Sequence, residues 1–264
     1  MGILNVTPDS FYDGGRYITT DNIRKRISKI IHEGADIIDV GGMSSRPGAE
    51  IISAEKEWER LDKALDIIRN ISAELPVSVD TFRSEIAHRS VEKYKAGIIN
   101  DISGGRMDPD MFDVVARNQL PYVMMHMQGT PSTMQKNPSY KDFPGDILTF
   151  FHQQTAKLRK KHIHDIIVDP GFGFGKTTEQ NFMLLHHLER FKIFSYPIMV
   201  GISHKSMITK FLQIPISETL PETSALHAMA ILHGADILRV HDVAAANHAV
   251  KLVMKTKNSF NKNW

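Results

Sequence analysis

Short runs of apolar residues alternate along this chain with longer stretches in which apolar residues recur every three or four positions. Eight short runs favour buried strands, at residues 2–6, 36–40, 77–80, 97–102, 122–126, 166–169, 198–202 and 237–240. The stretches between them have the helical period. Residues 21–33, for example, place Ile23, Ile27 and Ile30 on one face of a predicted helix, and residues 55–72 repeat the pattern.

Residues that begin and end helices stand where these predicted helices need them. Ser53 precedes the acidic first turn of the second helix, and Asp21 opens the first one after two threonines. Gly34, Gly97 and Gly234 each follow a helical stretch and precede a strand. We expect these glycines to end the helices in the left-handed conformation.

Strands that alternate with helices indicate a parallel sheet joined by right-handed crossovers. Eight such units predict an α/β fold, a single-domain (β/α)8 TIM barrel over residues 1–254, followed by a frayed tail at residues 255–264. A doubly wound open sheet is the alternative. It is less favoured because no Gly-x-Gly-x-x-Gly sequence follows any predicted strand.

The composition narrows the class of protein. The net charge of +2, with dispersed Lys and Arg, gives no case for nucleic acid as a partner. The absence of cysteine excludes disulfides and thiolate metal sites. No apolar run reaches the roughly 20 residues of a membrane span, and no signal peptide opens the sequence. We therefore expect a cytoplasmic protein with small-molecule partners.

Polar residues stand at the carboxyl ends of all eight predicted strands, where a barrel builds its active site. Asp80, Asn100 and Asp169 offer acceptors and an amide that suit a flat heterocycle rich in N–H groups. The cationic donors suited to an anion are Arg46, Lys205, Arg239 and His241. Arg239 interrupts an apolar strand, so its buried charge must be paired or face a ligand.

Three other sequence features give weaker indications of function. Asn5 offers an oxygen of the kind that magnesium takes alongside water and substrate phosphates. The run from Gly171 to Thr177 is similar to a phosphate-binding P-loop, but Pro170 stands where the first glycine belongs. No Gly-x-Ser-x-Gly sequence indicates a serine nucleophile.

A series of motifs, in order, resembles the dihydropteroate synthase family from residue 2 to about residue 253. They are 2–11 (GILNVTPDSF), 36–42 (DIIDVGG), 45–48 (SRPG), 78–81 (SVDT), 99–105 (INDISGG), 125–129 (MHMQG), 169–176 (DPGFGFGK) and 238–243 (LRVHDV). The resemblance implies a transferase of folate biosynthesis. Such an enzyme condenses 6-hydroxymethyl-7,8-dihydropterin pyrophosphate with para-aminobenzoate, giving 7,8-dihydropteroate and pyrophosphate.

The resemblance also implies roles for the matching positions. The pterin would be held by Asp80, Asn100, Met125, Asp169 and Lys205. The pyrophosphate would be held by Asn5, Arg46, Arg239 and His241, with magnesium (Mg2+) at Asn5. The para-aminobenzoate would lie beside Phe11, Ser45, Pro47, Phe174 and Ser206. The implied catalytic set is Asp9, Asp80, Lys205, Arg239 and His241, where Asp9 belongs to a mobile first loop. The family also implies a homodimer formed through barrel helices.

The chain departs from the family pattern at three positions. Met43 replaces a usual Glu, Ser45 a usual Thr and His204 a usual Arg, which exchanges a permanent charge for a titratable one. The sequence also opens at the first strand, without the family's short leading segment, so either its start is truncated or the barrel bottom is closed differently. Two other functions are weighed: a degenerate, non-catalytic pterin-binding paralogue, and a pterin-binding methyltransferase domain, which has no use for a pyrophosphate site.

Overall fold

The computed structural model describes residues 1–7, 19–44 and 48–260 of the chain. Within them lie eight parallel strands, each near a predicted position: β1 (Gly2–Asn5), β2 (Ile38–Gly41), β3 (Val77–Asp80), β4 (Ile98–Asp101), β5 (Tyr122–Met125), β6 (Ile166–Asp169), β7 (Met199–Val200) and β8 (Ile237–Leu238). The last two are shorter than predicted, because the backbone leaves regular pairing after two residues.

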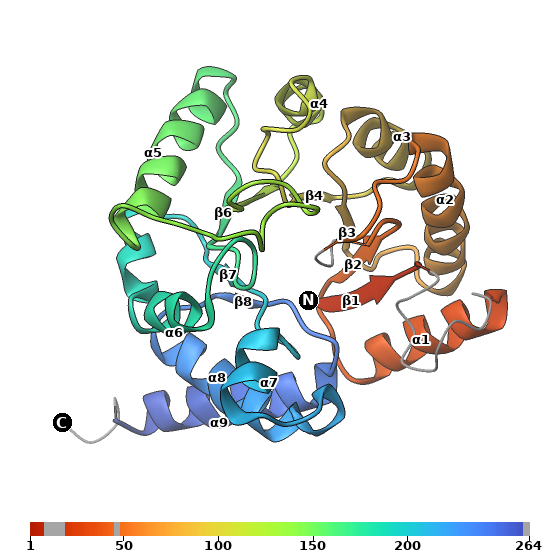
Figure 1. The fold of residues 1–264 in the computed structure, drawn as a ribbon. Helices are drawn as coiled ribbons and strands as arrows, with labels where there is room; N and C mark the ends of the chain where they lie inside the picture. Colours follow the sequence, from red (N-terminus) through yellow and green to blue (C-terminus); the bar gives the residue numbers. More distant parts are fainter. Residues whose placement is uncertain (8–18, 45–47, 261–264) are drawn as a thin grey trace.

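Helices follow the strands and surround them. They are α1 (Thr20–His32), α2 (Ala54–Ile71), α3 (Ser84–Tyr94), α4 (Met111–Asn118), α5 (Gly145–Lys160), α6 (Thr178–His186), α7 (Ser206–Leu212), α8 (Leu220–Leu232) and α9 (Val243–Phe260), with short 3-10 helices at η1 (Leu188–Phe194) and η2 (Ile216–Glu218). Figure 1 looks into the ring of strands, with the helices arranged around it. No helix in the described ranges is both long and apolar enough to cross a membrane.

The strands close on themselves. Strands β1 to β6 form one parallel sheet in sequence order, and β7 pairs with β8. Isolated parallel bridges join the two parts: Val168 pairs with Ile198, and Gly2 pairs with Val240. The Ile3 amide donates to the Val240 carbonyl at 2.9 Å across the second junction. The predicted (β/α)8 barrel is therefore confirmed, and the open-sheet alternative is wrong.

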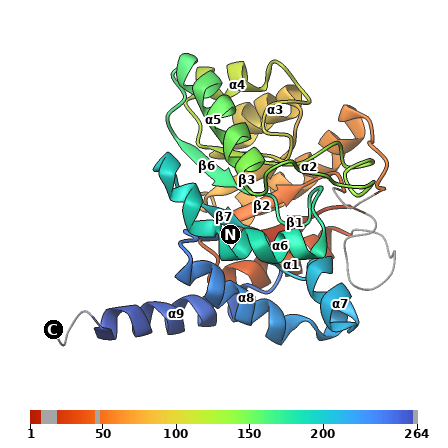
Figure 2. The same cartoon turned by 60° about the vertical axis from the view of Figure 1, so that its left-hand side comes forward.

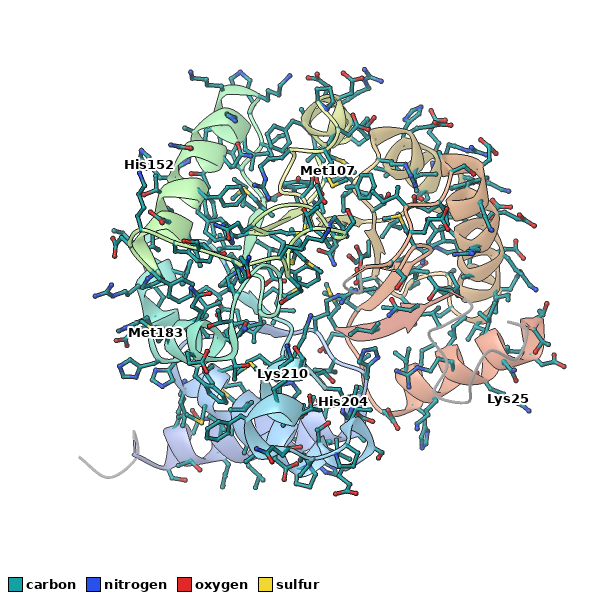
Figure 3. The ribbon with its side chains drawn as sticks, in the orientation of Figure 1. Lys25, Met107, His152, Met183, His204 and Lys210 are labelled. Carbon is teal, nitrogen blue, oxygen red and sulfur yellow. The ribbon has the colours of Figure 1, made fainter. Side chains whose placement is uncertain are left out.

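Side chains along each strand point alternately into the barrel and out toward the helices, so the strands contribute to two separate buried clusters. Ile98, Val123, Ile167 and Met199 form one buried cluster inside the barrel. Their neighbours in the chain pack outward into the larger core beneath the helices, among them Ile99, Tyr122, Met124, Val168 and Val200. Lys25 of α1 and His152 of α5 lie on the outer side of the ring (Figure 3). Residues two apart on a strand thus share the interior, which decides the side chains that can reach a common site.

The predicted helix boundaries mostly agree with the structure. The Ser53 hydroxyl accepts from the Lys56 amide at the start of α2. Gly34 (φ +84°) and Gly234 (φ +99°) follow α1 and α8 in left-handed conformation. The prediction for Gly97 is wrong, because Lys95 (φ +54°) already ends α3 two residues earlier.

The tail differs from its prediction. Helix α9 continues to Phe260, so residues 255–260 are helical rather than frayed. In Figure 2, α9 extends away from the body of the barrel. Residues 261–264 lie outside the described part of the chain.

Candidate active site

The register of the strands brings the predicted polar residues to one rim. Asn5 is paired with Gly41, Gly41 with Asp80, and Asp80 with Asn100. Asp169 ends β6 in register with Met125. All of these lie in phase with the inward-facing residues, as do Arg239 and His241 two and four positions beyond Ile237. The barrel therefore collects on one surface the groups that the sequence scatters over more than 200 positions.

Arg239 lies at the centre of this group. Its Nε donates to Asp39 Oδ2 at 2.6 Å, and its Nη2 donates to Asp80 Oδ2 at 2.8 Å. The prediction that this buried charge is paired is confirmed. Burial alone lowers the pKa of Arg239, but Asp39 and Asp80 outweigh it, so the pKa lies above its ordinary value. Burial raises the pKa of Asp80 to about 7, which Arg239 opposes and Asp39 reinforces.

Asp39 was missed in the sequence. Its side chain is fully buried, and Oδ2 also accepts from Asn100 Nδ2 at 3.1 Å, so it orients a predicted pterin ligand as well as Arg239. The signal that could have found it is the same as for Arg239: a charge inside an apolar strand, here Ile38-Asp39-Val40, in phase with the rim residues.

The ends of β6 and β7 form the next part of the rim. Asp169 is buried, and its Oδ1 accepts from the Gly171 amide at 2.8 Å. Burial raises the pKa of Asp169. Burial and Arg239 lower the pKa of Lys205 to about 8. The Lys205 Nζ lies 4.4 Å from the centroid of the Phe174 ring, so a cation and an aromatic face are adjacent. Ser206 is exposed at the first position of α7.

His241 follows β8 and lies among charged groups. Burial, followed by Arg239, lowers the pKa of His241 to about 3, so this side chain is neutral near pH 7. Counting His241 among the cationic donors was therefore wrong; it offers a neutral ring nitrogen. The His241 carbonyl accepts from Arg26 Nη2 at 2.6 Å, and the same nitrogen reaches the Ile3 carbonyl at 3.2 Å. Arg26 thus joins the rims of β1 and β8.

His204, which stands where the family usually has arginine, is partly buried in the turn between β7 and α7. Its Nε2 lies 2.5 Å from Asp242 Oδ2, and its Nδ1 lies 2.6 Å from Thr219 Oγ1. The hydrogen bond from His204 lowers the pKa of Asp242. The backbone of His204 is left-handed (φ +53°), and the following residue is Lys205. The histidine therefore ties the turn that carries Lys205 to the segment after β8.

An apolar wall faces the polar rim. Phe82, Ile102, Met125, Met127 and Met134 form one buried cluster. The partly buried side chains that pack against it are Met43, Met107 and Phe174. Met125, predicted at the pterin site, is 3% exposed and belongs to this wall. At position 43 the chain therefore has apolar packing where the family usually has a carboxylate.

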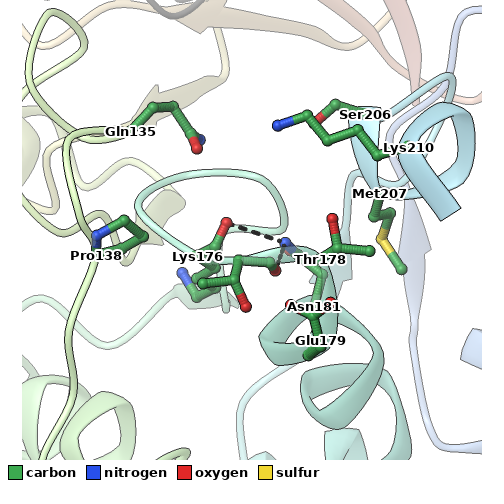
Figure 4. A pocket seen from close by; sticks show the side chains of 10 residues that line it. Gln135, Pro138, Lys176, Thr178, Glu179, Asn181, Ser206, Met207 and Lys210 are labelled. Carbon is green, nitrogen blue, oxygen red and sulfur yellow. Dashed lines mark hydrogen bonds between the residues drawn. The ribbon is translucent and has the colours of Figure 1, made fainter.

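Five predicted site residues lie outside the described residues: Asp9, Phe11, Ser45, Arg46 and Pro47. Within the described ranges, no group of three or more His, Asp or Glu side chains has the arrangement of a metal site. A cavity of about 270 Å³ opens beside Ser206 (Figure 4). Its lining includes Gln135, Lys176, Thr178 and Lys210, which come from three successive loops and helices around the rim.

Comparisons with known proteins bear on this site. Residues 1–241 match the family described as "Pterin binding enzyme". The chain is 42% identical over 258 residues to a dihydropteroate synthase of Escherichia coli (strain K12), covering 97% of this chain and 90% of that one. A solved dihydropteroate synthase of Yersinia pestis in complex with a sulfonamide drug superposes with a TM-score of 0.91 at 36% identity, over 98% and 93% of the two chains. One from Xanthomonas albilineans, solved with 4-aminobenzoic acid, has a TM-score of 0.88 at 36% identity, over 97% and 92%.

Proposed function

The chain belongs to the dihydropteroate synthase family of pterin-binding enzymes, and from that premise we propose how its barrel rim is divided between the substrates. The enzyme is a transferase of folate biosynthesis that condenses 6-hydroxymethyl-7,8-dihydropterin pyrophosphate with para-aminobenzoate, giving 7,8-dihydropteroate and pyrophosphate. Relatives that carry this name match nearly the full chain, and neither the degenerate paralogue nor the methyltransferase domain has comparable support.

The pterin, in this proposal, lies among Asp80, Asn100, Asp169 and Lys205, with Met125 beneath it. The observation that carries the proposal is the partly buried ion pair between Asp80 and Arg239, with Asp80 in register with Asn100. Ionised carboxylates accept hydrogen bonds only, so Asp80 and Asp169 suit the N–H edge of the heterocycle. Lys205 supplies a donor for a ring carbonyl or ring nitrogen.

The pyrophosphate lies, in this proposal, toward β8 and β1. Arg239 and Lys205 supply positive charge there, and His241 supplies a neutral N–H donor. Arg46, outside the described residues, would add a second guanidinium. Asn5 fits magnesium in chemistry: its side-chain oxygen faces Gly41, where an added Cβ would lie 3.1 Å away, beside the Asp80 carboxylate. A bound magnesium ion takes amide oxygens and waters, and it would neutralise pyrophosphate charge.

The arylamine would lie between Phe174 and Ser206, with Phe11, Ser45 and Pro47 from loops outside the described residues, and Asp9 in the first of those loops. We propose a dissociative substitution. The bond between the pterin methylene carbon and the pyrophosphate oxygen breaks with its electron pair on oxygen, and the pterin ring delocalises the cation. The amine lone pair then forms the new C–N bond, and the amine proton passes to the departing oxygen or to water. Because an arylamine is neutral at pH 7, the site needs no strong base.

Two measurements test the function and the division of the site. Wild-type enzyme, magnesium, pterin pyrophosphate and labelled para-aminobenzoate should yield dihydropteroate and pyrophosphate. Lys205→Ala and Asp169→Asn should each weaken pterin binding in calorimetry by at least about tenfold, since each removes a charged hydrogen-bonding partner. Lys210→Ala, on the nearby cavity rim, serves as the charge-matched control. Near-wild-type pterin affinity in either site variant would refute its role.

We also propose a homodimer through the barrel helices α7, α8 and α9, of which α8 packs against α9. Large apolar side chains are exposed there, including Phe211 (65%), Leu232 (57%) and Leu252 (70%). Exposed apolar patches of this kind mark interaction surfaces. Light scattering should report a dimer that Leu232→Asp converts to a monomer, whereas Lys25→Asp, on α1, should leave it intact. A monomeric wild type would refute the proposal. The cytoplasmic location stays a prediction.

A further inference from the structure

Lys176 is a buried lysine in the loop between β6 and α6. Its side chain is part of a residue only 3% exposed. The Nζ atom donates to the Gly171 carbonyl at 2.8 Å and the Phe174 carbonyl at 3.1 Å, and it lies 3.1 Å from His126 Nδ1. An ammonium group has three N–H bonds, and these three acceptors match them. Lys176 therefore points into the protein, unlike the lysine of a P-loop, which faces a phosphate.

The lowered pKa of His126 agrees with this arrangement. Burial, followed by Lys176, lowers the pKa of His126 well below its ordinary value, so the ring is neutral and can present an unprotonated Nδ1 to the lysine. Burial lowers the pKa of Lys176 to about 7, although the Asp169 carboxylate acts to raise it. A buried amine is unfavourable unless every donor is satisfied. Here all three donors are used within one loop and the strand end beside it.

The loop that Lys176 holds is rich in glycine. Gly171, Gly173 and Gly175 have φ angles of +75°, +80° and +65°. A Cβ on Gly171 would lie 1.9 Å from the His126 carbonyl oxygen, so the loop packs directly on the end of β5. Glycine allows this path but does not specify it, because the residue has wide conformational freedom. The hydrogen bonds from Lys176 to both ends of the loop select one path for its backbone.

Each end of the loop leads to a different part of the site. The Gly171 amide donates to Asp169 Oδ1 at 2.8 Å, next to the proposed pterin. At the other end, the Phe174 ring faces Lys205 Nζ at 4.4 Å, next to the proposed arylamine. Asp169 is also held by strand β6, whereas Phe174 lies on the loop itself. Loss of the Lys176 bonds should therefore displace Phe174 more than Asp169.

We propose that Lys176 is a positioning residue of the arylamine subsite, which fixes the loop Gly171–Gly175 and thereby the place of Phe174 against Lys205. This inference rests on the proposed division of the site, in which Phe174 borders the para-aminobenzoate. A Phe174→Ala variant tests that premise separately, because it should raise KM for para-aminobenzoate if Phe174 borders the arylamine. A raised KM in Phe174→Ala, combined with an inert Lys176→Met, would refute this inference and leave the division standing.

The test compares Lys176→Met, which keeps the length and loses the donors, with Lys210→Met on the same cavity rim (Figure 4). Lys176→Met should raise KM for para-aminobenzoate by about tenfold or more, since displacements of about 1 Å cost rate and binding on that scale. KM for the pterin pyrophosphate should change by less than about threefold. Lys210→Met should leave both within about twofold. Equal changes in the two KM values, or none, would overturn the proposal.

A chemical rescue separates positioning from general stability. The chain has no cysteine, so Lys176→Cys carries a single thiol. Alkylation of the unfolded chain with 2-bromoethylamine, followed by refolding, restores an amine of lysine length, whereas 1-bromopropane adds the same length without a donor. The aminoethyl form should recover KM for para-aminobenzoate to within about threefold of wild type, and the propyl form should not. Recovery in both forms would overturn the proposal.

A surface variant tests the role of the loop in arylamine binding if the substitutions at Lys176 prevent folding. Gln135 is exposed, and its Nε2 donates to the Gly173 carbonyl at 2.6 Å, holding the same loop from outside. Gln135→Ala should loosen the loop without opening the core and should raise KM for para-aminobenzoate selectively. An unchanged KM in this variant would show that the position of the loop does not govern arylamine binding, and would overturn the proposal.

Discussion

Replacing Asp39 with asparagine should lower the pH at which the enzyme loses its pterin. In the wild type, burial holds the pKa of Asp80 near 7, and Asp39 is among the charges that raise it. The pterin is proposed to donate an N–H to ionised Asp80, so affinity should fall as the pH drops through about 7. Asp39→Asn keeps an acceptor for Arg239 and Asn100 but removes one negative charge beside Asp80.

The size of the effect follows from electrostatics. Two unit charges about 6 Å apart repel by roughly 3 kcal/mol at an effective dielectric constant of about 20, or about two pKa units. Two carboxylates that share one guanidinium are separated by a distance of that order. Removing Asp39 should therefore lower the pKa of Asp80 by about one to two units. The weaker bond to Arg239 and the relieved repulsion oppose each other, so the free energy of unfolding should change by less than about 2 kcal/mol.

The sign of the effect on stability can be checked independently. An acid whose pKa is raised by folding binds more protons folded than unfolded between about pH 4 and 7. The contribution of Asp80 to stability is therefore present at low pH and is lost as the pH rises through about 7. With Asp39→Asn the loss should end at a lower pH, because the folded pKa is lower. Urea unfolding at pH 5 and pH 8 measures the difference.

Calorimetric titration of the pterin at a series of pH values is the decisive assay. The midpoint of the loss in affinity should move from about pH 7 to between about 5 and 6 in Asp39→Asn. The matched control is Asp113→Asn, which removes a surface carboxylate paired with Lys161. A midpoint that stays at pH 7, or rises, in a folded Asp39→Asn would refute the electrostatic reasoning.

Two further predictions concern stability. Gly105 has φ +76°, and an added Cβ would lie 2.2 Å from the Phe112 ring, so Gly105→Ala should lower the free energy of unfolding by more than about 2 kcal/mol in urea titration. Gly97→Ala, where the Cβ meets open space, should cost less than about 1 kcal/mol, and an equal loss in both would contradict the steric argument. Tyr122→Phe should cost about 2 kcal/mol, because the buried Tyr122 hydroxyl donates to Asp101 at 2.7 Å; an unchanged urea midpoint would contradict this.

Periodicity predicted most of the fold. The eight strands and the first two helices could be predicted because a buried strand and an amphipathic helix each need apolar residues at fixed intervals. This spacing does not depend on how the elements are arranged in the fold. Gly97 shows the limit of local signals. Lys95 takes the left-handed position and ends α3 two residues earlier, which the glycine alone does not reveal.

The candidate site was predicted less completely. The sequence shows polar residues at the ends of apolar strands, namely Asp80, Asn100, Asp169 and Arg239. The register of the strands brings them together. Asp101 lies beside them in sequence but faces outward to Tyr122, so strand phase separates a rim residue from a structural one. The sequence presents Lys176 only as part of a phosphate-binding motif that Pro170 breaks. Its contacts depend on the path of a glycine-rich loop, which no sequence pattern fixes.

The pairing of β1 with β8 has a consequence for how the protein is made. The Gly2–Val240 bridge joins residues that emerge from a ribosome far apart in time, roughly 10 to 50 seconds at ordinary rates of synthesis. Until then, a nascent sheet of up to six strands has two unpaired edges, which can pair with other chains. Arg239 and His241 arrive in the same last segment. A nascent chain therefore gains Arg239 and His241, two of the proposed anion-binding groups, at the same time as it loses its exposed edges, and a chain truncated before β8 should have neither benefit.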